Sequence, residues 1–393
     1  MQKNNGTLQQ ILHTHPYTAQ TPHTRRVLEQ LKQCRTPALG YHLYRCKQET
    51  CATVKYQYHS CRNRHCPQCG ALQKKQWVED RQRELLPLPY YHVVFTLPHQ
   101  LNAITLGNRS VLFNLLFKAA ADTLLQFAKD EQYLGARPGI LAVLHTWGQQ
   151  LSFHPHVHCV VSGGGIIKRP QPDGTSKICW KQLKRKDNRF LFPVKAMSIV
   201  YRAIFLKELK RLIENKTVVL TDLQQPSYKA LLQQLGQQPW VVYAKKPFGG
   251  PQQVVSYLAA YTHKVAVTNQ RLLDCDVQGQ VRFRYKDYRS GGVQKHMQLP
   301  ATEFLRRFEQ HILPKGFTKI RTYGYLANRG RQGNLQAITR AFNIPAHPPA
   351  VKIPWQLRLY EMYGIRHDQC PCCNKISMVL VRKTLGPAGP DTS

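Results

Sequence analysis

The most regular alternation of polar and apolar residues lies in Ser152–Gly165, which reads SFHPHVHCVVSGGG. Side chains alternate between the two faces of a strand, so His154, His156, His158 and Val160 share one face. The pattern therefore predicts a strand from which His156 and His158 point the same way. The three glycines that follow are expected to end this strand, because glycine adopts backbone conformations that other residues avoid.

The remaining pattern predicts a mixture of strands and helices. Apolar and β-branched runs predict strands over residues 90–97, 140–146 and 240–244, and a β-hairpin over residues 281–299. Apolar residues at helical spacing predict helices over residues 1–33, 71–86, 108–133, 199–215, 228–235, 253–265 and 302–312. Residues 163–190 predict a loop. The link before the histidine strand is short, which favours antiparallel pairing with the preceding strand and an α+β fold.

The helix predicted over residues 253–265 carries two tyrosines four residues apart. Tyr257 and Tyr261 lie on one face of such a helix, and Lys264 shares that face. Ordinary amphipathic packing also produces this spacing. In a functional interpretation, the tyrosines attack a phosphodiester, and Lys264 stabilises the phenolate or holds a phosphate oxygen. A divalent metal on His156 and His158 would polarise that phosphate, although histidine pairs in strands are often only hydrogen bonded or exposed.

The net charge narrows the choice of partner. The 393 residues include 56 Lys and Arg against 21 Asp and Glu, which gives a formal net charge of +35. An excess of this size along the whole chain favours a polyanion, so nucleic acid is the expected partner and a membrane surface is the weaker alternative. We expect neither a membrane span nor a secretory signal, and therefore a cytoplasmic, nucleoid-associated protein whose cysteines stay reduced.

Cysteines and histidines crowd into residues 34–69, which predicts structural zinc. One zinc is expected to be held by a set that contains the tight Cys-Pro-Gln-Cys spacing: Cys46, Cys51, Cys66 and Cys69. A second zinc would use the other ligands of this region: Cys34, His42, Cys61 and His65. His59 is the expected spare. Near the other end of the chain, Cys370-Pro-Cys-Cys373 is half of a zinc knuckle, which could complete a distant site or bind nothing.

Basic residues interleaved with aromatic ones are further candidates for contact with DNA. These residues are Arg282, Arg284, Lys286, Lys319 and Arg321. Aromatic rings can stack on unpaired bases while Arg and Lys follow the phosphates. Each residue could equally lie on a solvated strand face beside a core aromatic side chain, but the total charge favours at least one DNA-binding groove.

Taken together, these motifs resemble the HUH endonuclease superfamily and, within it, the two-tyrosine rolling-circle transposases of IS91-type insertion sequences. The resemblance rests on His156-Val157-His158, on Tyr257-Leu-Ala-Ala-Tyr261-Thr-His-Lys264, on the strand from His92 to Pro98 and on the segment from Leu313 to Asn328. The cysteine-rich region near the amino terminus also matches the layout of this family.

The resemblance implies an antiparallel sheet of four or five strands, with the histidine pair on a central strand and the tyrosines on a facing helix. It implies that the substrate is single-stranded DNA at element ends, cleaved to a 5′-phosphotyrosine with Mg²⁺ or Mn²⁺. The expected third metal ligand is His145 or His154, with His263 a weaker candidate. Host replication or helicase proteins are possible partners, since no GxxxxGK[ST] phosphate-binding loop occurs in the chain.

The expected organisation has four parts. They are a helical segment over residues 1–33, a zinc-binding domain and helix over 34–86, a nuclease domain over 87–330 with an insertion at about 165–250, and a Pro-rich segment with a Cys cluster and tail over 331–393. Two other functions stay open at this point. A replication initiator would share the same chemistry, and a zinc-containing DNA-binding protein without catalysis would need neither the histidine pair nor the tyrosines.

Overall fold

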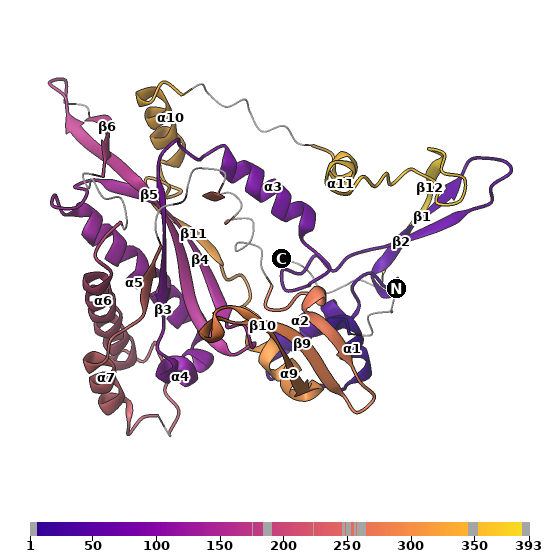
Figure 1. The fold of residues 1–393 in the computed structure, drawn as a ribbon, viewed down its shortest axis with the longest axis horizontal. Helices are drawn as coiled ribbons and strands as arrows, with labels where there is room; N and C mark the ends of the chain where they lie inside the picture. Colours follow the sequence, from indigo (N-terminus) through magenta and orange to yellow (C-terminus); the bar gives the residue numbers. More distant parts are fainter. Residues whose placement is uncertain are drawn as a thin grey trace.

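A six-stranded antiparallel sheet forms one end of this elongated molecule, and a three-stranded sheet forms the other (Figure 1). The structure is a computed structural model, and its description covers residues 6–174, 176–183, 191–222, 224–245, 248, 253–254, 257, 265–344 and 353–386. Helices and antiparallel sheets are mixed along the chain, which confirms the predicted α+β class.

The large sheet has the order β11-β4-β5-β3-β7, and β6 pairs with the far end of β5. Its strands are β3 Tyr90–Thr96, β4 Arg137–Trp147, β5 Phe153–Pro170, β6 Ser176–Gln182, β7 Val242–Ala244 and β11 Ile320–Gly324. Every pairing is antiparallel. The histidine strand β5 therefore lies at the centre of the sheet, as the family resemblance implied.

The three glycines do not end β5, contrary to the sequence expectation. The strand continues through Gly163–Gly165 to Pro170 and pairs there with β6, so the loop predicted over residues 163–190 contains a strand. A Cβ atom on Gly165 would lie 2.6 Å from the backbone of Arg137, and one on Gly164 would collide with the Trp180 ring. The glycines are needed because neighbouring groups approach the strand closely.

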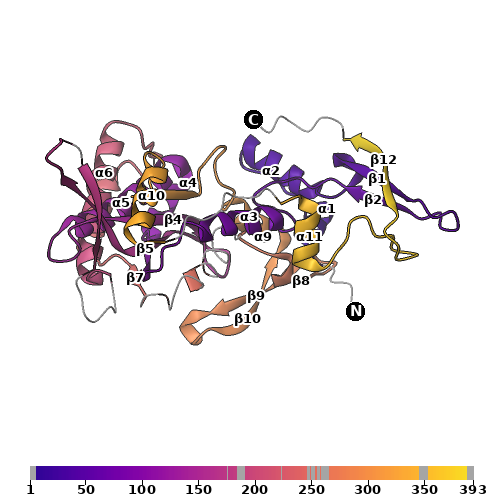
Figure 2. The same cartoon turned by 90° about the horizontal axis from the view of Figure 1, so that it is seen from above.

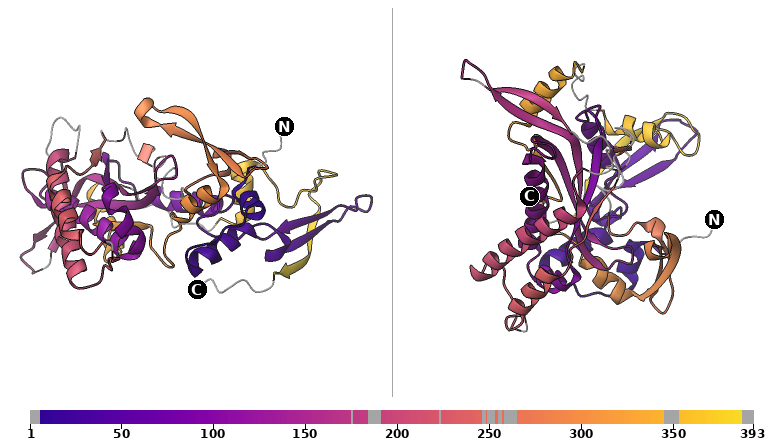
Figure 3. Two further views of the ribbon diagram at one scale, coloured as in Figure 1. Left: turned by 90° about the horizontal axis from the view of Figure 1, so that it is seen from below. Right: turned by 60° about the vertical axis from the view of Figure 1, so that its left-hand side comes forward.

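One face of the large sheet carries the main hydrophobic core. Val157, Cys159 and Val161 alternate out of β5 into this core, where they are fully buried. The covering helices are α5 Arg109–Lys129, α6 Val194–Glu214 and α7 Tyr228–Gln237, with the short α4 Asn102–Gly107 at the edge (Figure 3). Both α6 and α7 come from the predicted insertion, which also supplies the edge strand β7.

We expected no segment that could span a membrane, but helix α5, with 21 residues, is long and apolar enough to do so by length and composition. In the structure, 67% of its apolar stretch is buried inside the protein, and Phe113, Leu116 and Phe117 are fully inaccessible. Burial against the sheet explains the apolar composition of this helix.

The amino-terminal residues form two helices instead of the single predicted helix. These are α1 Leu8–Thr14 and α2 Pro22–Lys32, and α2 begins after Thr21, whose side chain caps it, with Pro22 in the first turn. They pack against β8 Leu272–Cys275, the hairpin of β9 Gln280–Asp287 and β10 Val293–Pro300, and α9 Ala301–Glu309. The hairpin predicted over residues 281–299 is confirmed, but it belongs to this second core.

The small sheet at the far end joins segments from opposite ends of the chain. Its order is β12-β1-β2, with β1 Gly40–Cys46, β2 Val54–Tyr58 and β12 Met378–Leu385 (Figure 2). Between the two sheets lies α3 Ala71–Gln82 (Figure 1). The Pro-rich segment over residues 331–393 contains α10 Arg331–Ala341, α11 Trp355–Tyr363 and β12. Short 3-10 helices complete the described chain: η1 Pro37–Leu39, η2 His99–Leu101, η3 Asn269–Arg271 and η4 Tyr288–Ser290.

Candidate active site and metal centres

Three imidazoles meet on the face of the large sheet opposite the main core. In the pairing of β4 with β5, His145 lies directly across from His156, and Val143 lies across from His158. Directly opposed residues share a face, so His145 joins the two predicted histidines. One ligand nitrogen of each lies within 4.8 Å of the others, and His145 and His158 are buried. This spacing and donor set fit a divalent metal ion.

The structure distinguishes between the candidates for the third metal ligand. His145 belongs to the cluster, which we call the imidazole cluster, whereas the side chain of His154 is exposed. The backbone carbonyl of His154 lies 2.6 Å from Nδ1 of His156, which orients that ring. His263, Tyr261 and Lys264 lie outside the described residues.

Tyr257 lies beside the imidazole cluster. Its hydroxyl is 2.8 Å from Nδ1 of His158 and is also hydrogen bonded to Nε2 of His92. Nε2 of His92 lies 3.0 Å from Nδ1 of His158, and the planes of the two rings are parallel within 6°. Tyr257 also contacts Phe248, with ring centroids 5.2 Å apart. One of the two predicted tyrosines therefore meets the predicted histidines.

Sequence reasoning missed His92 as a site residue. It lies on β3 across from Val160, and it therefore shares the face of His156 and His158. Burial, and then the positive charges of Lys245 and His156, lower the pKa of His92 to about 3. His92 is thus a neutral imidazole beside the tyrosine hydroxyl. The apolar run over residues 90–97 predicted the strand, but the face of His92 and its neighbouring strand appear only in the fold.

Four cysteines near the amino terminus form a first thiol group, the proximal thiol cluster: Cys34, Cys61, Cys66 and Cys69. The Sγ atoms of Cys34 lie 3.4 Å from Cys69 and 3.6 Å from Cys66, and Cys61 lies 3.7 Å from Cys69. Cys34 directly follows α2, and the other three precede α3. These distances fit tetrahedral zinc, in which sulfurs at about 2.3 Å from the metal lie about 3.8 Å apart.

Four further cysteines form a second group, the distal thiol cluster: Cys46, Cys51, Cys370 and Cys373. The expected grouping of Cys46 and Cys51 with Cys66 and Cys69 is therefore wrong in this structure. The β1 strand leads toward the far end of the molecule, where it pairs with β12 (Figure 1). Cys46, the last residue of β1, and Cys51 after it therefore lie beside Cys370 and Cys373. The half-knuckle at Cys370 thus meets a second cysteine pair, Cys46 and Cys51, that is far away in the sequence.

The two histidines expected in the second zinc set lie elsewhere. Nε2 of His65 accepts a hydrogen bond of 3.3 Å from the backbone N–H of Leu313, and burial lowers the pKa of His65. The ring of His42 packs against that of His59, with centroids 4.8 Å apart. Neither histidine belongs to a thiol cluster among the described residues.

Comparisons with known proteins agree on one family. A family model described as "Transposase zinc-binding domain" matches residues 5–97, and one described as "Putative transposase" matches residues 139–333. The chain is 42% identical over 394 residues to "Putative transposase y4qJ" of Sinorhizobium fredii, covering 98% of this chain and 94% of that protein. The chain belongs to the IS91-type transposase family.

A second relative extends this result to a named insertion sequence. The transposase is 31% identical over 340 residues to "Transposase for insertion sequence element IS801" of Pseudomonas savastanoi pv. phaseolicola, covering 86% of this chain and 79% of that protein. No solved structure matches it. The zinc-binding model includes every ligand of the proximal thiol cluster but stops far before Cys370.

Four of the five basic residues predicted to contact DNA divide into two groups. Arg282 forms an ion pair with Asp274, and Arg321 lies 4.4 Å from the centroid of the Phe117 ring and 2.5 Å from Oδ1 of Asn114. Arg284 and Lys286 instead line a groove of about 420 Å³ with further basic, aromatic and amide residues: Gln149, Gln270, Arg271, Tyr285, Tyr288 and Gln294. Basic and aromatic lining of this kind suits a nucleic-acid strand.

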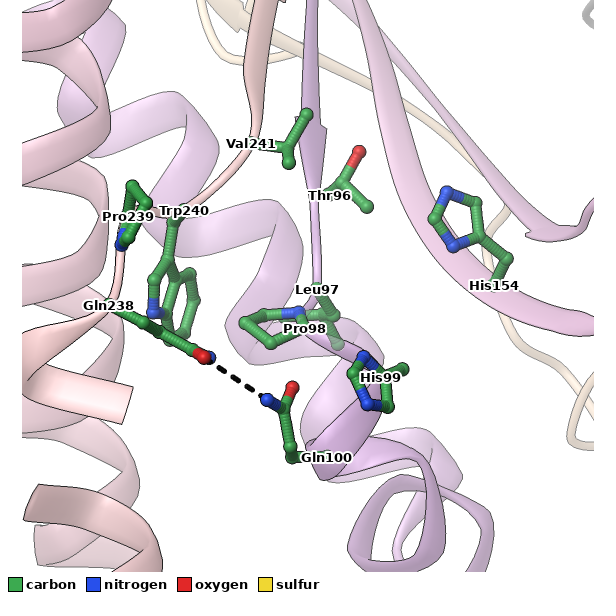
Figure 4. Close-up of a pocket in the computed structure, with 10 residues that line it drawn as sticks. All are labelled: Thr96, Leu97, Pro98, His99, Gln100, His154, Gln238, Pro239, Trp240 and Val241. Atoms are coloured by element: carbon green, nitrogen blue, oxygen red, sulfur yellow. Dashed lines mark hydrogen bonds between the residues drawn. The ribbon is translucent and has the colours of Figure 1, made fainter. Parts of the chain in front are cut away.

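Lys319 lies next to the imidazole cluster. Its carbonyl accepts a hydrogen bond of 3.0 Å from the backbone of Leu144. Its Nζ lies 5.1 Å from the centroid of Trp147, and that ring stacks on His145. His154 also lines a pocket of about 460 Å³ together with Thr96, Gln100 and Trp240 (Figure 4). The volume of this pocket is in the usual range for small-ligand pockets, about 300–1,000 Å³.

Proposed function

We propose that this transposase cleaves and rejoins single-stranded DNA at insertion-sequence ends through a covalent bond to tyrosine. The observation that carries the proposal is the contact of 2.8 Å between the Tyr257 hydroxyl and His158, within a face that also presents His145 and His156. A nucleophile and a set of metal ligands are thereby adjacent. A zinc-containing DNA-binding protein without catalysis would have no need of this arrangement.

In the proposed step, the Tyr257 oxygen attacks a DNA phosphorus and forms a phosphorus–oxygen bond. The bond from phosphorus to the 3′ oxygen of the preceding nucleotide breaks, and that oxygen leaves as a hydroxyl with one proton. The proton released by the phenol balances this proton, so no water or oxidant is consumed. The 5′-phosphotyrosine keeps the energy of the phosphodiester, which permits rejoining to another 3′ hydroxyl. Tyr261 would accept a second strand.

The imidazole cluster is the proposed holder of Mg²⁺ or Mn²⁺. His145, His156 and His158 would supply three ligands, and phosphate oxygens and water would complete the shell of a hard cation. When bound, the ion supplies charge neutralisation at the phosphate. The carbonyl of His154 fixes the His156 ring, so Nε2 of this ring faces the ion site in the proposal.

His92 is the proposed positioning residue for the nucleophile. Its ring packs on Tyr257 with centroids 4.5 Å apart, and its Nε2 is hydrogen bonded to the hydroxyl. A buried, neutral imidazole can hold the phenol without adding a second positive charge to the site. Tyr257 is consequently aligned toward the imidazole cluster before DNA binds.

The proposed DNA path runs from the groove at Arg284 and Lys286 toward Lys319. Gln149 joins these regions, because it lines the groove and lies in the turn between β4 and β5. Lys319 would hold a phosphate oxygen near His145, and the pocket at Gln100 would accept a base beside the scissile phosphate. In this proposal the transposase acts at the nucleoid, where host helicase or replication proteins expose the single strands of DNA.

The proximal thiol cluster is the proposed zinc site of the matched zinc-binding domain. Its four thiols would fill all four positions of a tetrahedral ion, so the zinc would have a structural role and no open position for substrate. This zinc would hold the end of α2 against the segment that leads to α3.

The decisive experiment uses labelled single-stranded oligonucleotides from the ends of the insertion sequence, with Mg²⁺ or Mn²⁺. We expect a covalent protein–DNA species on a denaturing gel, and we expect Tyr257→Phe combined with Tyr261→Phe to abolish it while binding to DNA is retained. Tyr228→Phe, on α7 behind the sheet, is the matched control and should form the adduct normally. Persistent adducts in the double variant would place the nucleophile elsewhere.

The same experiment separates transposition from replication initiation. A transposase should accept oligonucleotides from both ends of the element and join the cleaved end to a second strand. A replication initiator would prefer one origin-like sequence. The names of both relatives favour the transposase, since each is described as one.

A further inference from the structure

We propose that the distal thiol cluster holds a second structural zinc, which clasps the carboxy-terminal segment of the chain onto its first strand. The ligands would be Cys46 and Cys51 from the β1–β2 hairpin, and Cys370 and Cys373 from the turn before β12. The family model for the zinc-binding domain contains only the first pair. This inference does not depend on the proposed cleavage chemistry.

The sulfur positions agree with tetrahedral coordination. The Sγ atoms of Cys46 and Cys373 are 3.8 Å apart, and those of Cys51 and Cys370 are 3.7 Å apart. Zinc–sulfur bonds of about 2.3 Å in a tetrahedron require about 3.8 Å between sulfurs. A disulfide would instead bring two sulfurs to about 2.0 Å. The cysteines are thus spaced around a common centre and are not paired.

The backbone around each cysteine pair is shaped as a knuckle. Asn374 has φ 57°, a left-handed conformation that turns the chain after Cys373, and its N–H donates to the carbonyl of Cys370 at 3.0 Å. The N–H of Cys370 donates to the carbonyl of Lys375 at 2.9 Å. On the other side, the N–H of Cys51 donates to the carbonyl of Gln48 at 2.9 Å. Both turns direct two thiols toward one point.

The small sheet has little else to stabilise it. Its buried hydrophobic cluster consists of Tyr44, Cys46, Cys51, Cys370 and Met378. Three of these five are proposed ligands, so the core of this module is largely the metal site itself. A module with so few buried aliphatic side chains normally requires a metal or disulfides to fold.

A second contact brings the carboxy-terminal segment into place. Arg358 on α11 is 4% exposed and forms an ion pair of 2.7 Å with Glu79 on α3. From there the chain reaches the knuckle, and β12 then pairs with β1 from Met378 opposite Cys46 to Leu385 opposite Gly40. The clasp therefore lies at the start of this pairing and fixes its register.

The test measures metal in the full-length chain. We expect two zinc ions per chain in the wild type and one in the Cys370→Ser, Cys373→Ser double variant. Cys372 is exposed within the same knuckle and outside the cluster, so Cys372→Ser is the matched control and should retain two. The proposal is overturned if the double variant retains as many zinc ions as the wild type.

Two further measurements keep the test independent of the folding of the variant. Cobalt titration of the metal-free proteins should give thiolate-to-cobalt absorption that saturates at one equivalent more in the wild type than in the double variant; equal saturation points would also overturn the proposal. Limited proteolysis should then cut residues 365–386 at least tenfold faster in the double variant than in Cys372→Ser. Equal cutting rates would contradict a clasp, even if zinc were bound there.

Discussion

The large sheet and the small sheet are held together in different ways. The imidazole cluster lies on strands whose other face is anchored in the main core, by fully buried residues such as Val157 and Val161. The distal thiol cluster has almost no core apart from its own cysteines. The histidines are therefore positioned by strand register before any ion binds, whereas the cysteines come from segments far apart in the sequence, whose pairing the proposed metal would reinforce.

Because of this difference, we expect metal ions to have two roles in this chain, one chemical and one structural. An ion at the imidazole cluster would add chemistry to a stable scaffold, and its loss should leave the fold intact. An ion at the distal thiol cluster would add stability to a region with few buried side chains, and its loss should open that region while the large sheet persists. The predictions that follow test this contrast.

The largest effect is expected at the imidazole cluster. His156→Ala should lower covalent adduct formation by about 10³-fold even with excess Mn²⁺, since a ligand to the proposed ion is lost. His156 is only half-buried, so the melting temperature should change by no more than a few degrees. His42→Ala, on β1 of the small sheet and outside every described ligand cluster, is the control and should remain within about threefold of wild type. Normal cleavage by His156→Ala would refute the ligand assignment.

Removal of zinc should affect the opposite region. A strong chelator is expected to raise amide hydrogen exchange in β1 and β12 by at least 10²-fold, because their free energy of unfolding comes largely from the metal. Exchange in β4 and β5 should stay within about threefold. Mass spectrometry of peptic fragments measures both regions in one sample. Parallel loss of protection in both would mean that the two sheets unfold as one unit.

A smaller effect is expected for the residue that positions the nucleophile. His92→Phe should reduce adducts on Tyr257 by about 10- to 100-fold, in the range of one or two lost hydrogen bonds. The share of adducts on Tyr261 should rise at the same time, which a general loss of stability would not cause. Peptide mapping of the labelled adduct measures this share. His92→Gln, which keeps a polar group, should recover much of the Tyr257 signal; if it does not, the hydrogen bond is not the relevant contact.

The smallest effect concerns the seam between the large sheet and the second core. His311 bonds to the Leu151 carbonyl at 3.1 Å, and burial, with a contribution from Arg109, lowers the pKa of His311 to about 4. In the unfolded chain this histidine has a pKa of about 6.5 and binds a proton more readily than in the folded protein. Protonation therefore favours unfolding: the free energy of unfolding is highest above pH 6.5 and declines as pH falls toward 4. We expect a loss of roughly 2 kcal/mol between pH 7.5 and pH 5.

Chemical denaturation at the two pH values measures this loss. His311→Gln removes the titrating group, so its free energy of unfolding should vary less with pH than that of wild type by the same amount. An identical pH dependence in both proteins would show that other groups cause the acid sensitivity.

The sequence predicted well those features that depend on local pattern. Alternation around His156 gave both the strand and its histidine face, and helical spacing gave α5, α6, α7 and α9 with ends shifted by several residues. The glycines within β5 were wrongly expected to end the strand, since their role depends on Arg137 and Trp180, which lie on other strands. Local pattern cannot distinguish a glycine required for close approach from one required for a turn.

Features that depend on pairing between distant segments were not predictable. The choice of His145 over His154 follows from the register between β4 and β5, which spacing alone does not determine. The cysteine sets failed for the same reason, because Cys46 lies at the end of β1 and meets Cys370, whereas Cys66 meets Cys34 near the end of α2. Proximity along the chain was a poor guide to shared ligation.

The pairing of β1 with β12 has a consequence for synthesis of the protein. During translation, β1 emerges early with one edge open, and its partner is made more than three hundred residues later. An open edge can recruit strands from other chains, so nascent molecules on one messenger are exposed to mispairing throughout that interval. A copy of the gene interrupted before codon 378 would leave this edge open permanently, and such a product should aggregate or be degraded.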